Sequence, residues 1–295
     1  MPSVVRSKNT GNLFVVSTPI GNLEDITLRA IRVLKEVDII AAENIRRAKL
    51  LLKYFDINKE VISFRRENQK GMTIKIMNKL EEGHDVALIS DAGTPGISDP
   101  GAYLVNYALD KGLRVIPVPG PSAITTAISV SGFSIKGFIF TGFLPISSGK
   151  RKKLLKSLSL QIFPIVFFEA PHRLLQTLKD IKDIMGNRKI VVFKELTKLH
   201  EKILRDKVGT ILKKLCSKEI KGEYVIIVSG LKKDDNKENH ITYEVVSKID
   251  QLLKNGFSTK DIAKLVSADK GLTYREIYRK CLERKKLLYG DCKKA

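Results

Sequence analysis

One junction of the chain reads Ser90-Asp91-Ala92-Gly93-Thr94-Pro95-Gly96-Ile97-Ser98-Asp99-Pro100-Gly101-Ala102. It follows the apolar run Val86–Ile89, which is typical of a strand, and it precedes an apolar pattern at residues 104–109 that is typical of a helix. An ordinary turn of this kind needs only about two to six residues. Glycine lets the backbone approach a ligand closely, so the junction predicts a ligand site at the carboxyl end of a strand. A long but ordinary turn is the alternative.

Short apolar runs alternate with amphipathic stretches on both sides of this junction. We expect strands at residues 13–16, 39–42, 61–64, 86–89 and 115–118, then at 138–140, 164–168, 190–193 and 224–228. Strands that alternate with helices favour an α/β fold with a largely parallel sheet. Three prolines in residues 117–121 interrupt the pattern and indicate a domain boundary.

The last part of the chain has a different pattern. Residues 232–240 contain no apolar side chain and are expected to be a solvated linker. Beyond them the periodicity is only helical, with start signals at Ser258-Thr259 and at Thr273 with Glu276. We therefore predict two α/β domains, residues 1–119 and 120–231, and a small helical module, residues 241–295.

Charge is the second strong signal. The 295 residues include 53 Lys and Arg against 32 Asp and Glu, a formal net charge of +21. Such an excess favours a polyanionic partner, above all nucleic acid, although a lysine-rich proteome would produce part of it. The chain has no apolar run long enough for a membrane span, and its three cysteines lack metal-ligand spacing. We expect a cytoplasmic protein with no membrane and no metal site.

Three further loops follow predicted strands. Residues 18–22 lack the glycine pattern of a dinucleotide fold, and no P-loop motif is present in the chain. Residues 119–123 open a helix with small side chains, which would let a ligand approach its free N–H groups, unless the segment is only an interdomain hinge. Residues 168–173 place Glu169 beside His172 and Arg173, either for acid–base or anion-binding chemistry or as a solvated helix start.

A basic cluster follows the Gly/Ser-rich residues 147–149. Its members are Lys150, Arg151, Lys152, Lys153 and Lys156. We expect it to project from a mobile loop and to contact phosphate without sequence specificity, unless it only makes the surface soluble.

Together these loops resemble the tetrapyrrole-methylase superfamily, and more closely its ribosomal RNA small subunit methyltransferase I branch. The resemblance covers about residues 11–231 and is carried by residues 17–23, 41–43, 90–101, 119–123, 141–145, 168–173, 195–198 and 221–223. Residues 256–279 also resemble the helical module of such proteins. The chain departs from the branch at Asn44-Ile45, where Asp-Thr is usual, and at residues 65–68, where a His-Glu-His-Asn-like stretch is usual.

The resemblance implies a homodimer that binds S-adenosylmethionine in a cleft between two α/β domains. Its cofactor-binding residues would be Pro19, Asp91, Gly93, Thr94, Ile97, Ser122, Ala123, Phe143 and Leu144. The implied reaction is 2′-O-methylation of a cytidine ribose in 16S rRNA, at nucleotide 1402 in the usual numbering, with the 30S subunit as substrate.

Three residues are catalytic candidates under this resemblance. Glu43 or Glu169 would accept the proton or orient the hydroxyl, and Lys198 would act beside them on nearby phosphates. The expected RNA-binding residues are Arg46, Lys150, Arg151, Lys152, Lys153 and Arg173. Methylation of a tetrapyrrole such as a precorrin, and a non-catalytic rRNA-binding role in assembly, stay open as alternatives.

Overall fold

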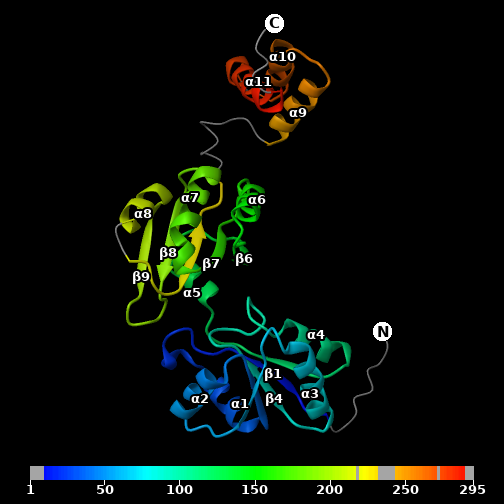
Figure 1. The fold of residues 1–295 in the computed structure, drawn as a ribbon, viewed down its shortest axis with the longest axis vertical. Helices are drawn as coiled ribbons and strands as arrows, with labels where there is room; N and C mark the ends of the chain where they lie inside the picture. Colours follow the sequence, from blue (N-terminus) through cyan, green and yellow to red (C-terminus); the bar gives the residue numbers. More distant parts are fainter. Residues whose placement is uncertain (1–9, 217–218, 232–242, 271–272, 290–295) are drawn as a thin grey trace. The chain divides into compact units, whose positions relative to one another are not determined.

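The computed structural model describes residues 10–216, 219–231, 243–270 and 273–289, and the expected linker at 232–240 lies outside them. The chain divides into two compact units, residues 1–230 and 231–295. The first unit contains two separate five-stranded sheets (Figure 1). The expected boundary near residue 119 falls between these sheets, yet both sheets belong to the same compact unit.

The first sheet is wholly parallel, as the alternation predicts. Its strands are β1 (Leu13–Val16), β2 (Ile39–Ala42), β3 (Glu60–Ser63), β4 (Val86–Ile89) and β5 (Val115–Val118), in the order β3-β2-β4-β1-β5. All residues of β2 and β4 are buried because helices cover both faces. Pro117 is tolerated because β5 is an edge strand.

Two pairs of helices cover this sheet. They are α1 (Leu28–Glu36) and α2 (Ile45–Tyr54) on one face, with α3 (Gln69–Glu81) and α4 (Ala102–Asp110) on the other, and the short 3-10 turn η1 (Leu23–Asp25) precedes α1. Each face buries its own apolar cluster, and the clusters include the last residues of β1, β2, β4 and β5, so the loops that follow these strands begin from a packed base. Leu28, the first residue of α1, is 86% exposed, whereas Ala30 and Val33 are buried.

The second sheet is mixed. Its strands are β6 (Ile139–Phe143), β7 (Ile165–Glu169), β8 (Lys189–Lys194), β9 (Lys202–Lys207) and β10 (Tyr224–Val228), in the order β6-β7-β10-β8-β9. Only the β6–β7 pair is parallel; the other pairs are antiparallel. Strand β9 is not among the predicted strands, because it is an exposed edge strand whose charged residues hide its alternation.

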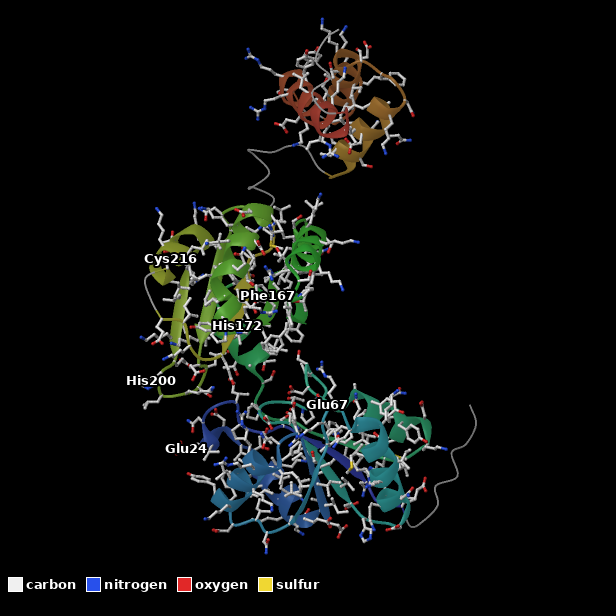
Figure 2. The ribbon with its side chains drawn as sticks, viewed as in Figure 1. Glu24, Glu67, Phe167, His172, His200 and Cys216 are labelled. Atoms are coloured by element: carbon white, nitrogen blue, oxygen red, sulfur yellow. The ribbon has the colours of Figure 1, made fainter. Side chains whose placement is uncertain are left out.

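Helices of the second half pack mainly on one face of this sheet. They are α6 (Ser148–Leu158), α7 (Leu174–Met185) and α8 (Val208–Leu215), while α5 (Ala123–Ser129) packs against the other face and the 3-10 turn η2 (Pro171–Arg173) leads into α7. Phe167 is fully buried beneath α6, α7 and α8, whereas His200 lies at the tip of the β8–β9 loop (Figure 2).

The C-terminal unit is helical, as expected. It consists of α9 (Tyr243–Lys254), α10 (Thr259–Lys270) and α11 (Tyr274–Tyr289) around a small apolar core. The predicted start at Ser258-Thr259 is confirmed, because the Ser258 hydroxyl accepts a hydrogen bond from the Asp261 N–H at 3.2 Å. None of the described helices has the length and apolar character needed to cross a bilayer.

The basic cluster at residues 150–156 forms part of α6 and is therefore not a mobile loop. Arg151 is 3% exposed, and its Nη2 and Nε lie 2.7 and 2.8 Å from Oδ2 of the buried Asp180 on α7. The expectation that Arg151 contacts RNA therefore has to be corrected, because its guanidinium joins two helices inside the fold. Lys150, Lys152 and Lys153 are exposed.

We predict that Arg151→Met lowers the free energy of unfolding by about 3–5 kcal/mol, because it leaves the Asp180 carboxylate buried without its main partner. The double variant Arg151→Met/Asp180→Leu should recover most of this loss. Lys153→Met, at an exposed position of the same helix, is the control. Urea unfolding measures all three, and a single-variant loss no larger than that of Lys153→Met would contradict the assignment.

Candidate active site

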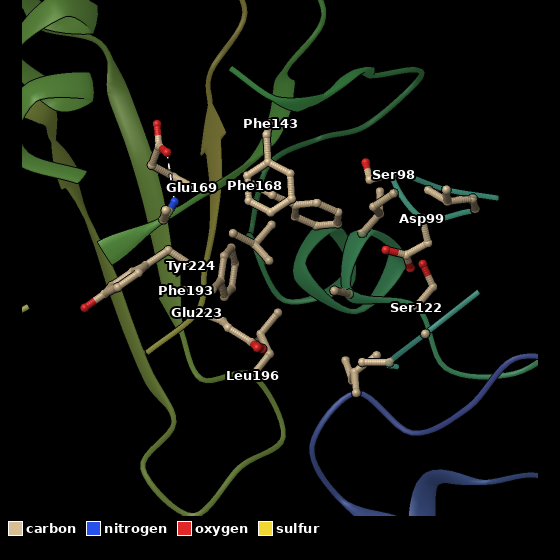
Figure 3. Close-up of a pocket in the computed structure, with 18 of the residues that line it drawn as sticks. Ser98, Asp99, Ser122, Phe143, Phe168, Glu169, Phe193, Leu196, Glu223 and Tyr224 are labelled. Carbon is tan, nitrogen blue, oxygen red and sulfur yellow. Dashed lines mark hydrogen bonds between the residues drawn. The ribbon is translucent and has the colours of Figure 1, made fainter. Parts of the chain in front are cut away.

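A cavity of about 350 Å³ lies between the loops of the two α/β halves (Figure 3). One wall comes from Ile20, residues 92–94 and 97–99, and the start of α5. The opposite wall comes from Phe143, Phe168, Phe193 and residues 222–225 at the ends of strands in the second sheet. Its volume is within the range of about 300–1,000 Å³ that small-molecule sites occupy.

The structure brings most of the expected cofactor residues to this cavity. Those that line it are Gly93, Thr94, Ile97, Ser122, Ala123 and Phe143. Pro19 and Asp91 instead line a neighbouring hollow of about 390 Å³ at the ends of β1, β2 and β4. Leu144 has to be corrected, because its side chain is 2% exposed in the core of the second sheet.

Backbone pairing fixes the loop that forms the first wall. Thr18 and Gly93 exchange two backbone hydrogen bonds of 2.9 and 3.0 Å, so the junction after β4 is joined to the loop after β1. The Ser17 and Thr94 hydroxyls lie 2.8 Å apart next to this bridge. Gly93 has a φ of 78°, which residues with a side chain rarely adopt. This position therefore requires glycine for the loop to close.

The lining of the cavity suits a ligand with a cationic centre and a flat apolar body. None of the described residues that line it is Lys or Arg, whereas Asp99, Glu169 and Glu223 are carboxylates. The Phe168 ring packs 5.6 Å from the Phe143 ring, and aromatic faces attract cations. Phosphate-bearing cofactors would lack a counter-charge here. A sulfonium attached to an adenosyl group fits this donor set.

Three carboxylates gather beside the first wall. Burial, together with the nearby charge of Glu43, raises the pKa of Asp99 to about 6. Burial and the charge of Asp91 also raise the pKa of Glu43. Arg47 on α2 lies 3.2 Å from Asp91 and offsets part of this repulsion. Asp99 thus changes protonation near neutral pH, and it is the member of the group that lines the cavity (Figure 3).

Asp99 is not among the functional residues expected from the sequence. The junction contains two aspartates eight positions apart, and the pattern does not indicate which of them faces a ligand. In the structure Asp91 turns toward α2, while Asp99 lines the cavity. The one signal beside Asp99 is the pair Pro100 and Gly101, which is typical of a tight turn.

Basic side chains surround the acidic group on its outer side. Arg65 Nε donates to the Glu43 carbonyl at 3.2 Å, and Arg66 Nη2 donates to the Ser98 carbonyl at 3.3 Å. Arg46 is exposed on α2, where it lines an open groove of about 530 Å³ with Lys49, Lys53 and Arg65. We call this the α2 groove. The α2 groove gives the outer face of the site a positive charge, which the described residues that line the cavity do not supply.

The departure from the family pattern at Asn44 has a local explanation. The Asn44 side chain accepts hydrogen bonds from the N–H groups of Arg46 and Arg47 at 3.0 and 3.3 Å, and so caps α2. Asparagine performs this role as well as the usual aspartate does. The replacement therefore keeps the start of α2 in place.

Glu169 is not placed as a free base. It is 1% exposed, and its Oε1 accepts hydrogen bonds from Arg173 Nε and Nη2 at 2.8 and 2.5 Å. Its Oε2 accepts a hydrogen bond from the Thr177 hydroxyl at 2.5 Å. Arg173 also donates to the Leu144 carbonyl at 3.2 Å. The roles expected of Glu169 in proton transfer and of Arg173 in RNA binding have to be corrected, because this pair joins β7 to α7.

Lys198 also acts within the fold. Its Nζ lies 2.9 Å from Glu223 and 3.1 Å from Glu195. Burial lowers the pKa of Lys198, but its hydrogen bonds to the two glutamates raise it more, so the net shift is upward. Lys198 therefore stays protonated and pairs with the cavity residue Glu223, and its place among the catalytic candidates stays a prediction.

The sequence and the fold both have close parallels. The family model described as Tetrapyrrole (Corrin/Porphyrin) Methylases matches residues 12–212. Ribosomal RNA small subunit methyltransferase I of Halalkalibacterium halodurans is 41% identical over 91% of this chain and 93% of its own length. The protein of that name from Thermotoga maritima is 48% identical over 75% of this chain and 99% of its own length.

Solved structures show the same fold at low sequence identity. Diphthine synthase matches with a TM-score of 0.58 at 14% identity, over 75% of this chain and 90% of its own. Uroporphyrin-III C-methyl transferase from Thermus thermophilus, complexed with S-adenyl homocysteine, matches with a TM-score of 0.56 at 16% identity, over 74% of this chain and 97% of its own. The chain therefore belongs to the tetrapyrrole methylases and, within them, to the ribosomal RNA small subunit methyltransferase I family, with S-adenosylmethionine as its cofactor.

Proposed function

We propose that the chain transfers a methyl group from S-adenosylmethionine to the 2′-hydroxyl of a cytidine ribose in small-subunit rRNA, at nucleotide 1402 in the usual numbering. The observation that carries the proposal is Asp99, a carboxylate with a pKa of about 6 that lies where a cation-free cavity meets a basic outer face. The names of the relatives support the RNA substrate.

The chain supplies two things to this reaction. When bound, S-adenosylmethionine supplies a methyl group that is already activated by the sulfonium. A ribose hydroxyl is a poor nucleophile, and holding it in line with the methyl group provides roughly 7–11 kcal/mol of the barrier reduction. The residues of the cavity and the α2 groove hold the two reactants in this arrangement.

Asp99 is the proposed general base, in preference to Glu43. The hydroxyl oxygen forms a bond to the methyl carbon, the carbon–sulfur bond breaks with its electron pair going to sulfur, and the hydroxyl proton passes to the Asp99 carboxylate. A base of this kind contributes about 10²–10⁴-fold in rate. Burial, together with the charge of the neighbouring Glu43, keeps the pKa of Asp99 high enough for proton transfer near neutral pH.

The exposed cations are the proposed contacts for RNA. Arg46 lies in the α2 groove, and Lys150, Lys152 and Lys153 are exposed on α6. Phosphate contacts of this kind set the position of the RNA, while the 2′-hydroxyl distinguishes RNA from DNA. As the resemblance implies, we also propose the 30S subunit as substrate and a homodimer as the working form. A cytoplasmic location, expected from the composition of the chain, is part of the proposal.

The function is tested by transfer of labelled methyl from S-adenosylmethionine to small subunits that lack this modification. We expect a single 2′-O-methylated cytidine after nuclease mapping, and no transfer when that position carries deoxyribose, because the accepting oxygen is then missing. Transfer to a base nitrogen would contradict the proposal. Transfer to a precorrin and not to RNA would favour the tetrapyrrole alternative.

We predict that Asp99→Asn lowers kcat about 10²–10⁴-fold and leaves binding of S-adenosylhomocysteine within a few-fold. In the wild type, kcat should rise with pH through about 6, because the base acts only when ionised. Single-turnover rates between pH 5 and pH 8 measure this, with the exposed Asp110→Asn as the matched control. Full turnover by Asp99→Asn would remove Asp99 from the role of base.

The same substitution should raise stability. The folded-state pKa of Asp99 is above the ordinary value of 3.8, so between about pH 4 and pH 6 the folded state binds more protons than the unfolded state. Wild-type stability therefore falls as pH rises through this window. We expect Asp99→Asn to unfold at a higher temperature than wild type at pH 8, with the difference shrinking toward pH 4. A difference that does not change with pH would show that Asp99 is not desolvated.

A further inference from the structure

The C-terminal unit has an excess of positive charge that the active site does not use. Residues 243–289 contain eleven Lys and Arg against six Asp and Glu. Several of these charges act within the unit, since Arg284 pairs with Asp250, and Lys280 pairs with Glu283 at 2.8 Å. The role of the other basic residues depends on which face of a helix each one occupies.

Helix α11 separates an apolar side from a cationic one. Ile277 and Cys281, four positions apart, are fully buried in the core of the unit. Arg275 and Arg279 are also four positions apart, but they fall on the other side of the helix, and both are exposed. The ion pairs between described side chains of this unit, Lys280–Glu283 and Arg284–Asp250, involve neither arginine.

Aromatic side chains flank these arginines. The rings of Tyr274 and Tyr278 stack with centroids 5.9 Å apart and an angle of 11° between their planes. Tyr274 is 42% exposed, while Tyr278 packs against the core and holds the pair in place. Lys285 is exposed further along the helix. We call Arg275 and Arg279, with Tyr274 beside them in the first turn, the α11 face.

We propose that the α11 face is an RNA-binding site in the C-terminal unit. Flat guanidinium groups bind phosphate oxygens through paired hydrogen bonds, and an exposed aromatic ring stacks on an unpaired base. The face offers both kinds of group within two turns of one helix. The inference rests on the proposed function, because the RNA it binds is the methylation substrate.

The shape of α11 favours RNA over a lipid surface. A helix that lies on a membrane needs a free apolar side to insert between the lipids. Here the main apolar side packs against α9 and α10 through Ile277 and Cys281, and the exposed Leu282 and Leu287, five positions apart, do not share one face. The charges of the exposed side suit a polyanion that lies along the helix.

The test uses the full chain and a fluorescently labelled RNA stem-loop, with anisotropy measured over a range of salt concentrations. Arg275→Ala/Arg279→Ala should weaken binding about tenfold near 0.1 M salt and reduce the slope of log K against log[salt] by about 1.5, since each lost phosphate contact removes roughly 0.7–0.9. Lys260→Ala/Lys264→Ala removes the same charge from exposed positions of α10 and is the matched control. Arg275→Lys/Arg279→Lys should keep the slope. Equal thermal unfolding of all variants excludes misfolding as the cause.

Two results would overturn the inference. One is an effect of the α11 double variant no larger than that of the α10 control, and the other is equally strong competition by inorganic polyphosphate, which would indicate a general anion surface. Methyl transfer to small subunits is measured on the same preparations. Transfer by the wild type without an α11 effect refutes this inference alone, and an α11 effect without transfer refutes the proposed function alone.

Discussion

The site depends on the pairing between Thr18 and Gly93. Two backbone hydrogen bonds join the loops that follow β1 and β4, which are neighbours in the first sheet. This fixes residues 92–99 as one wall of the cavity and places Asp99 where burial raises its pKa. A Cβ at Gly93 would strain the left-handed backbone on which this pairing depends. The glycines and prolines of the junction are therefore explained by geometry before any chemistry is considered.

Charge is divided between the inside and the outside of the site. The described residues that line the cavity are apolar, polar or acidic, which suits a cationic donor. The α2 groove outside it carries four cations, which suits an anionic acceptor. Asp99 lies at the border between these environments. One small site can thus hold two reactants of opposite charge without attracting either to the wrong place.

The sequence predicted the parallel first sheet from its apolar runs and a ligand site at the glycine-rich junction, whereas the individual cofactor residues were implied by the family resemblance. The prediction from sequence was wrong at residues whose role depends on the direction in which the side chain points. Residues 150–153 are four consecutive cations, and only the phase of α6 turns Arg151 inward to Asp180. Glu169 and Arg173 look like exposed chemistry, but they are one helical turn apart and pair with each other. Strand β9 was hidden because an edge strand needs no apolar alternation.

The central claim is that this cavity and Asp99 deliver a methyl group to a ribose hydroxyl of RNA. A crystal structure with S-adenosylhomocysteine and a short RNA that contains the target cytidine tests it most directly. The account predicts the cofactor product between Gly93 and Phe143, with the ribose 2′-oxygen within hydrogen-bond distance of Asp99. A cofactor product in the hollow beside Pro19, or a base atom in place of the 2′-oxygen beside Asp99, would contradict it.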